Sequence, residues 1–169
     1  EHYADPTDVG STYASDTWTA TATIYNTVPE SGTNSVVFEM ASTIALDVGS
    51  SVEYGSVELG AYSNTTSATI YNKGNIPLNV KVKGDTNLMC NGSGSDSIPI
   101  GNVHFSTEPQ FGYSTSSVLG VSDTTVTLNL AKRTEESQSS VPLYFRLLMP
   151  GTGVGGTCSN TLTFTAISS

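Results

Sequence analysis

The stretch TWTATATIYN, residues 17–26, alternates strictly between apolar and hydroxyl-bearing side chains. The apolar positions are Trp18, Ala20, Ala22 and Ile24, and the positions between them are Thr17, Thr19, Thr21 and Thr23. Successive side chains of a β-strand point to opposite faces, so a period of two indicates a strand with one apolar and one polar face. We therefore expect residues 17–26 to form a half-buried β-strand.

The same alternation recurs in three later segments. Their apolar positions are Leu78, Val80 and Val82, then Val126, Leu128 and Leu130, and finally Leu162, Phe164 and Ala166. VPLYFRLLM, residues 141–149, is apolar at almost every position, which is typical of a central strand covered on both faces. Further strands are expected in the segments SVVFEM, TIALDV, SVEYGSVEL and SATIYN.

No segment carries the i, i+3, i+4, i+7 pattern of an amphipathic helix. About eight to ten short strands without helices predict an all-β fold, a single β-sandwich or jelly-roll-like domain with an extended N-terminal strand. A chain of 169 residues has the length of one domain. We expect an arm and first strand over residues 1–28, and the sandwich over residues 29–169.

Turn-forming residues separate the expected strands. NKGN, residues 72–75, is predicted to form a hairpin turn, and NGSGSD, residues 91–96, is a predicted loop. The polar and acidic residues 1–13 are expected to form an extended arm.

Composition argues against two classes of partner. The chain has 6 Lys and Arg against 15 Asp and Glu, a net charge of −9, whereas binding to a phosphate backbone needs clustered cations. No apolar run approaches the ~18 residues of a membrane span.

Charged residues make up only 12% of the chain, against about 25% in typical soluble domains. Because the sequence also begins with Glu1, we expect a processed extracellular or cell-surface protein.

The two cysteines, Cys90 and Cys158, do not form a C-x-x-C pair, which argues against zinc binding and thiol redox chemistry. In an oxidising compartment we expect one disulfide between them. Two buried free thiols are the alternative.

A glycine pattern raises the question of nucleotide binding. In PGTGVGGTCSNTLTFTA, residues 150–166, Gly151, Gly153 and Gly156 have the spacing G-x-G-x-x-G. A dinucleotide site needs this loop to enter a helix whose N-terminus faces the pyrophosphate. Here the loop enters another predicted strand, so we expect no nucleotide. We interpret the glycines as a wide hairpin or corner that uses positive φ angles.

Catalytic patterns are absent from the sequence. The only histidines are His2 and His104, and neither a G-x-S-x-G nor an H-E-x-x-H motif occurs. We expect His104 to be structural, and Glu135 and Glu136 to lie in a solvated loop, TEESQSS. The sequence therefore predicts a protein that is not an enzyme.

Carboxylates lie in or beside several predicted turns, where extracellular β domains bind Ca²⁺. They are Asp5, Asp8, Asp47, Glu53, Glu58, Asp85, Asp96 and Asp123. None forms an EF-hand series, so a structural Ca²⁺ ion is kept as an alternative without assigned ligands, and no other cofactor is expected. N-x-[S/T] sequons at Asn64 and Asn91 are the candidate glycosylation sites.

Two stretches resemble known surface proteins. They are EYGSVELGAYSNTTSATIYNKGNIPLNVKVKGD and VPLYFRLLMPGTGVGGTCSNTLTFTA. Both are similar to secreted β-sandwich surface proteins of archaea and some bacteria, in which an N-x-G-N hairpin precedes a strand and a P-G-x-x-x-G corner leads into a final T-x-T-F-T-A strand. The resemblance covers residues 52–167, and its motifs identify a module type without catalytic residues.

A narrower resemblance is to the subunits of archaeal threads and bundling pili and to TasA-like biofilm fibre proteins. It implies polymerisation by donor-strand complementation, in which a strand of one subunit fills a groove between strands of the next. The candidate donor is the N-terminal segment, through Trp18, Ala20, Ala22 and Ile24. The same strand would also serve as the first strand of its own sandwich.

We therefore expect a structural subunit of an extracellular filament or pilus-like fibre, whose partners are identical subunits and surface glycans. The alternative is a carbohydrate- or cell-binding module of a surface or S-layer protein, which a row of solvent-facing tyrosines on one sheet would favour. The tyrosines in question are Tyr54, Tyr62, Tyr113 and Tyr144, and the sequence does not assign them to faces.

Overall fold

The structure is a computed structural model that describes residues 4–27, 31–92, 96–134 and 139–169. Strands provide nearly all of the regular structure in these ranges. The helices described are two short 3₁₀ turns, η1 (Ile100–Asn102) and η2 (Tyr113–Thr115). The all-β fold class predicted from the alternating sequence is therefore confirmed.

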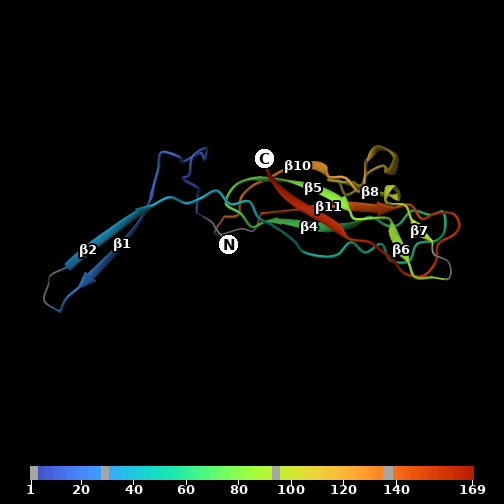
Figure 1. Cartoon of the computed structure of the whole chain (residues 1–169), viewed down its shortest axis with the longest axis horizontal. Coiled ribbons are helices and arrows are strands. Elements are labelled where there is room, and N and C mark those ends of the chain that lie inside the picture. Colours follow the sequence, from blue (N-terminus) through green and yellow to red (C-terminus); the bar gives the residue numbers. More distant parts are fainter. Residues whose placement is uncertain (1–3, 28–30, 93–95, 135–138) are drawn as a thin grey trace.

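Two antiparallel sheets form the body of the protein (Figure 1). The three-stranded sheet has the order β10 (Thr124–Leu130), β5 (Leu78–Gly84), β13 (Leu162–Ser168). The five-stranded sheet has the order β3 (Leu46–Val48), β4 (Thr66–Asn72), β11 (Ser140–Leu147), β8 (Val103–Ser106), β9 (Ser117–Val118). A small third sheet has the order β12 (Cys158–Ser159), β6 (Leu88–Cys90), β7 (Ser97–Ile98).

The core lies between the inner faces of the two large sheets. In β5 the predicted apolar positions Leu78, Val80 and Val82 are fully buried, and the residues between them are half-buried. Phe145 of β11 packs against Phe105 of β8, with 6.1 Å between ring centroids, and against Phe164 of β13, with 6.4 Å. Each such side chain contributes roughly 1.5–3 kcal/mol when it is removed from water, so this face-to-face contact stabilises the sandwich.

Strand β11 occupies the centre of the five-stranded sheet, as its apolar sequence predicted. Only one of its faces is buried, however. Leu143, Phe145 and Leu147 point into the core, whereas Tyr144 and Arg146 are half-buried on the outer face. The expectation that both faces are covered was therefore wrong, because no second layer packs over this side of the sheet in the described residues.

The NKGN segment is a crossover between sheets and not the hairpin turn that we expected. Strand β4 before it belongs to the five-stranded sheet, and β5 after it belongs to the three-stranded sheet. The fully buried Asn72 fixes this corner. Its Nδ2 donates to the carbonyls of Ile76 at 2.9 Å and of Leu130 at 3.1 Å, and its Oδ1 accepts from the amide of Gly74 at 2.9 Å.

The glycine-rich loop leads from β11 into β12 and β13, and therefore turns from one sheet toward another as a corner. Gly153 and Gly156 have φ angles of 82° and 80°, in the region that glycine adopts without steric cost. A Cβ on Gly156 would lie 2.6 Å from Oδ1 of Asn91. As the sequence predicted, the loop enters a strand, β12, and not a helix.

The predicted disulfide is present. Cys90 in β6 lies directly opposite Cys158 in β12, and a bond joins their sulfurs across 68 residues of sequence. Pairing of the two short strands brings the cysteines together, with 4.0 Å between their Cα atoms.

Two of the expected strands differ in the structure. SVEYGSVEL forms no regular strand, and SVVFEM contributes to β2 (Ser31–Phe38), which pairs with β1 (Trp18–Tyr25) outside both large sheets. This hairpin projects from one end of the sandwich (Figure 1). The boundary expected between residues 28 and 29 falls outside the described residues, but β2 belongs with β1 and not with the sandwich.

We expect replacement of Asn72 by alanine to lower the free energy of unfolding by about 3 kcal/mol, because it leaves buried backbone groups at the crossover without hydrogen-bond partners. Urea unfolding monitored by tryptophan fluorescence and circular dichroism measures the change. The exposed Asn26→Ala is the matched control and should stay within about 0.5 kcal/mol of the parent. Equal stabilities of the two variants would contradict the assigned role of Asn72.

Removal of the disulfide by the double substitution Cys90→Ala and Cys158→Ala should lower the free energy of unfolding by about 4 kcal/mol, since the bond closes a loop of 68 residues in the unfolded chain. The same measurement on the parent protein under reducing conditions should reproduce this loss. An unchanged denaturation midpoint in both experiments would show that the crosslink has no stabilising role.

Candidate assembly interface

The β1–β2 hairpin has one apolar face and one face that is polar except for Tyr25 and Val37. The two strands pair residue by residue from Trp18 opposite Phe38 to Tyr25 opposite Ser31, and residues directly opposite share a face. The apolar face carries Trp18, Ala20, Ala22 and Ile24 of β1, with Val36 and Phe38 of β2. The predicted alternation of β1 is thus present.

The apolar face of the hairpin is uncovered. Every residue of both strands is exposed, and Ile24 and Val36 keep 75% and 62% of their surface accessible. The expectation of a half-buried strand was wrong, because β1 pairs with β2 and packs on no second sheet in the described structure. An isolated two-stranded hairpin is marginally stable in water, so this element needs a partner surface.

Neither hairpin strand contains a charged residue or a proline. Soluble proteins usually protect exposed strand edges with lysines, prolines or bulges, which prevent pairing with other chains. The outer edges of β1 and β2 lack these features, and an apolar face lies beside them. This combination is typical of a surface that pairs with another strand.

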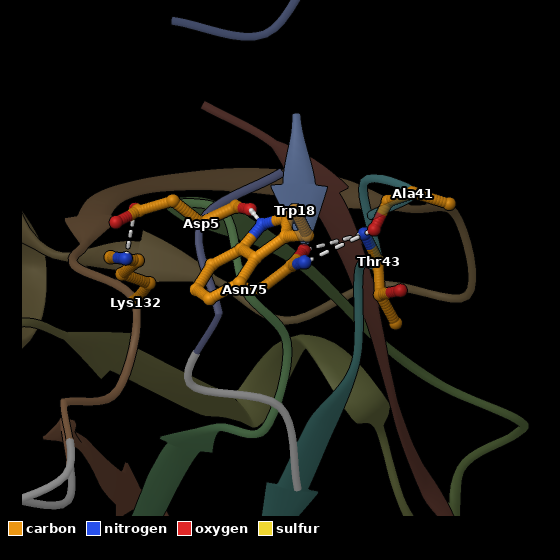
Figure 2. A network of polar contacts seen from close by, with 6 residues as sticks. All are labelled: Asp5, Trp18, Ala41, Thr43, Asn75 and Lys132. Carbon is orange, nitrogen blue, oxygen red and sulfur yellow. Dashed lines mark hydrogen bonds and ion pairs between the residues drawn. The ribbon is translucent and has the colours of Figure 1, made fainter. Parts of the chain in front are cut away.

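Figure 2 shows how the base of the hairpin is attached to the sandwich. The indole Nε1 of Trp18 donates to the backbone carbonyl of Asp5 at 3.0 Å, and the Asp5 carboxylate forms an ion pair with Lys132. Lys132 lies two residues after the end of β10, so this chain of contacts connects β1 to the three-stranded sheet.

A second connection holds the segment that leads from β2 into the sandwich. The buried Asn75 accepts a hydrogen bond from the amide of Thr43 at 2.7 Å and donates to the carbonyl of Ala41 at 3.0 Å (Figure 2). At Gly74 a Cβ would lie 2.2 Å from the Thr43 carbonyl oxygen, so glycine permits this close approach. The hairpin therefore leaves the sandwich from a fixed base.

The N-terminal residues also bind this base. The Thr7 amide donates to the Met40 carbonyl at 2.8 Å, and Asp8 accepts from both the amide and the hydroxyl of Ser42. These hydrogen bonds lower the pKa of Asp8. Residues 4–13 thus form turns against the chain that follows β2, and the extended arm that we expected is not present in them.

The short strands β6 and β7 lie at the end of the sandwich opposite the hairpin (Figure 1). A groove of about 900 Å³ lies beside them, lined in part by Leu88 of β6 and Ile98 of β7. One wall is the segment 51–57, and the other is formed by residues 156–162. Its apolar lining includes Val52, Leu88, Ile98, Leu147, Met149 and Leu162. Tyr54 is half-buried there, and burial raises the pKa of its phenol.

One wall of the groove has unpaired backbone groups, whereas the backbone of the other pairs with β6, β5 and the chain between them. In the described residues, no N–H or C=O group of residues 50–57 makes a backbone hydrogen bond, although the half-buried Val52 and Tyr54 alternate with exposed neighbours as in a strand. Strand β13 pairs with β5 on one side only and lies at the edge of its sheet. The groove is therefore bordered by the unpaired backbone of residues 50–57, which can accept a strand, and at Leu162 by the edge strand β13.

The other candidate residues are dispersed over the described structure. His104 is buried, its Nδ1 lies 3.1 Å from the Ser116 hydroxyl, and its ring stacks on Tyr113, which agrees with a structural role. Across the described ranges, no group of three or more His, Cys, Asp or Glu side chains is placed to hold a metal ion. His2, Glu135 and Glu136 lie outside the described residues.

The carboxylates near turns are dispersed over the molecule. Asp85 accepts a hydrogen bond from the Thr161 amide, which lowers the pKa of Asp85, and Asp123 forms an ion pair with Lys83 at 3.2 Å.

The candidate glycosylation sites Asn64 and Asn91 are both exposed, so a glycan would reach them from solvent, and their modification stays a prediction. The Oδ1 atom of Asn91 accepts from the Thr157 amide at 2.8 Å.

Comparison with known proteins gave no match, either to a family model or to a curated protein sequence. No helix in the described part of the chain is long and apolar enough to cross a membrane.

Sequence reasoning identified the apolar face of β1 but missed its partner β2 and the groove. SVVFEM and SVEYGSVEL were read simply as further strands of the sandwich, since alternation does not say which strand pairs with which. The role of Asn75 was also missed. Its position in the N-x-G-N motif was the available signal, because Asn beside Gly is common where the backbone turns sharply.

We expect Asn75→Ala to loosen the attachment of the hairpin, because the Thr43 amide loses its acceptor. The Thr43 amide should exchange with solvent at least tenfold faster, as measured by hydrogen exchange and NMR, while the amide of Val80 in the core keeps its protection. Asn26→Ala is again the control. Unchanged exchange at Thr43 would rule out the proposed anchoring.

Proposed function

We propose that this protein is an extracellular structural subunit that assembles head to tail into a filament. In this proposal the β1–β2 hairpin of one copy enters the groove between residues 51–57 and 156–162 of the next. The observation that carries it is the placement of two incomplete β-surfaces at opposite ends of one molecule (Figure 1). One is an uncovered apolar hairpin face, and the other is a groove lined by both apolar and polar side chains, with an unpaired backbone along residues 50–57.

The two surfaces are chemically complementary. A strand that enters the groove gains main-chain hydrogen bonds from its walls, and its alternate side chains meet the apolar floor. The hairpin supplies outer edges free of charge and proline, together with the apolar side chains of Trp18, Ile24 and Val36. Burial of these side chains supplies the free energy that an isolated hairpin lacks.

The donor in this proposal differs from the single strand implied by the resemblance. Strand β1 is already paired with β2 along its whole length, so one of its edges is occupied. The donated unit is therefore the whole hairpin. The outer edge of one hairpin strand pairs with the acceptor, and the apolar face of the hairpin lies over the groove.

Opposite placement of donor and acceptor determines the type of assembly. A contact between two different surfaces is heterologous, and repetition without ring closure produces an open helical polymer. The anchored base of the hairpin, held by Asn75 and by the contacts of Asp5, would fix the angle between successive subunits. The disulfide is compatible with an oxidising, extracellular location. A subunit of this kind needs no catalytic group.

Lysine substitutions in the hairpin test the proposal. The double variant Ile24→Lys and Val36→Lys places two charges on the apolar face, and we expect it to abolish filaments seen by negative-stain microscopy and light scattering. The matched control, Thr23→Lys and Ser35→Lys, places the same charges on the polar face and should still polymerise. A parent protein that stays monomeric at high concentration would overturn the proposal.

A mixing experiment tests the head-to-tail arrangement. Val57→Lys with Thr157→Lys places charges on both walls of the groove and should also prevent filaments. Mixed with the hairpin variant, it should form one-to-one dimers, because each variant keeps one functional surface. Self-association of the groove variant alone would show that hairpins pair symmetrically, which contradicts the proposal.

A further inference from the structure

The outer face of the five-stranded sheet carries an aromatic and cationic cluster that takes no part in the proposed assembly. Arg146 of β11 lies opposite His104 of β8. The residues on either side of Arg146 are buried in the core, so Arg146 points outward. Tyr62 lies against it, and Tyr113 packs between Tyr62 and His104; both tyrosines come from segments outside the large strands.

The cluster has a defined geometry. The guanidinium carbon of Arg146 lies 5.3 Å from the centre of the Tyr62 ring, a cation–π contact. Tyr62 and Tyr113 are tilted by 58° with centroids 4.9 Å apart, and Tyr113 stacks on His104 at 3.7 Å. The Tyr113 hydroxyl donates to the Asn102 carbonyl at 2.7 Å, so the ring that supports Tyr62 is fixed in place.

Arg146 is the unusual member of this group. Within the described residues its guanidinium makes no hydrogen bond or ion pair, and its Nε is buried without a partner. A buried donor left unpaired costs free energy, and a guanidinium pairs best with a carboxylate through two parallel hydrogen bonds. The chain has 15 acidic residues, yet none of the described ones neutralises this cation.

The surroundings of Arg146 are rich in hydroxyl groups and aromatic rings. Tyr62 is 51% exposed. Tyr144 points outward two residues before Arg146, about 7 Å along the strand, and lies opposite Ser67 on one side and Ser106 on the other. Tyrosine rings combine an apolar surface with a polar tip. This outer face therefore offers stacking surfaces and hydrogen-bonding groups beside one unpaired cation.

We propose that the cluster of Arg146, Tyr62, Tyr113 and His104 binds an acidic saccharide. Arg146 forms paired hydrogen bonds with a uronate carboxylate, while the sugar ring packs against the exposed Tyr62. The neighbouring hydroxyls of Tyr144, Ser67 and Ser106 bind the next sugar. An acidic peptide supplies the carboxylate but not the hydroxyl groups that this row would bind. The site lies on the outer sheet face, apart from the hairpin and the groove, so ligand binding and assembly are separable.

A galacturonic acid trimer is the test ligand, and the neutral galactose trimer is its matched control. Calorimetric titration of the full chain should detect binding of the acidic trimer. The affinity for the neutral trimer should be at least tenfold lower. Arg146→Met should weaken binding of the acidic trimer at least tenfold. Lys81→Met removes one positive charge from the other sheet and should leave binding unchanged. Thermal unfolding of both variants confirms that they fold.

NMR chemical shifts on the folded parent and variants locate the ligand. Perturbations at residues 62, 113 and 146 support the site, whereas their absence overturns it. An equal loss of affinity in the Lys81 and Arg146 variants would show a nonspecific charge effect and overturn it as well. Equally tight binding of tri-glutamate at these residues would show that the site recognises a carboxylate without selecting a saccharide, and would overturn the assignment.

Discussion

A β-sheet with an apolar face must cover that face, and this constraint organises the whole molecule. In the sandwich, β5 and β11 meet it by packing Val82, Leu143 and Phe145 into one buried cluster between the two sheets. The β1–β2 hairpin follows the same alternation, but none of the described segments forms a layer over it, so Ile24 and Val36 stay exposed. The proposed assembly follows from this difference, because a neighbouring copy would provide the missing layer.

Buried polar side chains determine how the parts are joined. Asn72 holds the crossover from one sheet to the other, and Asn75 holds the chain between the hairpin and the sandwich. Each amide satisfies backbone groups that a regular strand would pair with its neighbour. A hairpin on a fixed base presents its apolar face in one direction, which a regular filament requires and a flexible linker would not provide.

The two proposals use separate parts of the surface. Assembly involves the ends of the sandwich, whereas the saccharide site uses the outer face of the five-stranded sheet around Arg146 and Tyr62. Because this face stays open when copies join end to end, a filament would display the same site once in each subunit. Linked sites raise the overall avidity for a polymeric ligand even when each site binds weakly.

The sequence by itself determined which side chains share a face. Alternation predicted the buried rows of β5 and β10 and the apolar row of β1, and two cysteines in a chain of this composition predicted the disulfide. Tertiary structure alone decided which strands pair and what covers each face. NKGN crosses between the two sheets, and β1 pairs with β2. Tyr62 meets Arg146 on the outer sheet face, and residues 51–57 form the wall of a groove. The physical reason is that a period of two is a local property of the backbone, whereas the pairing of strands and the covering of faces depend on contacts between residues far apart in sequence.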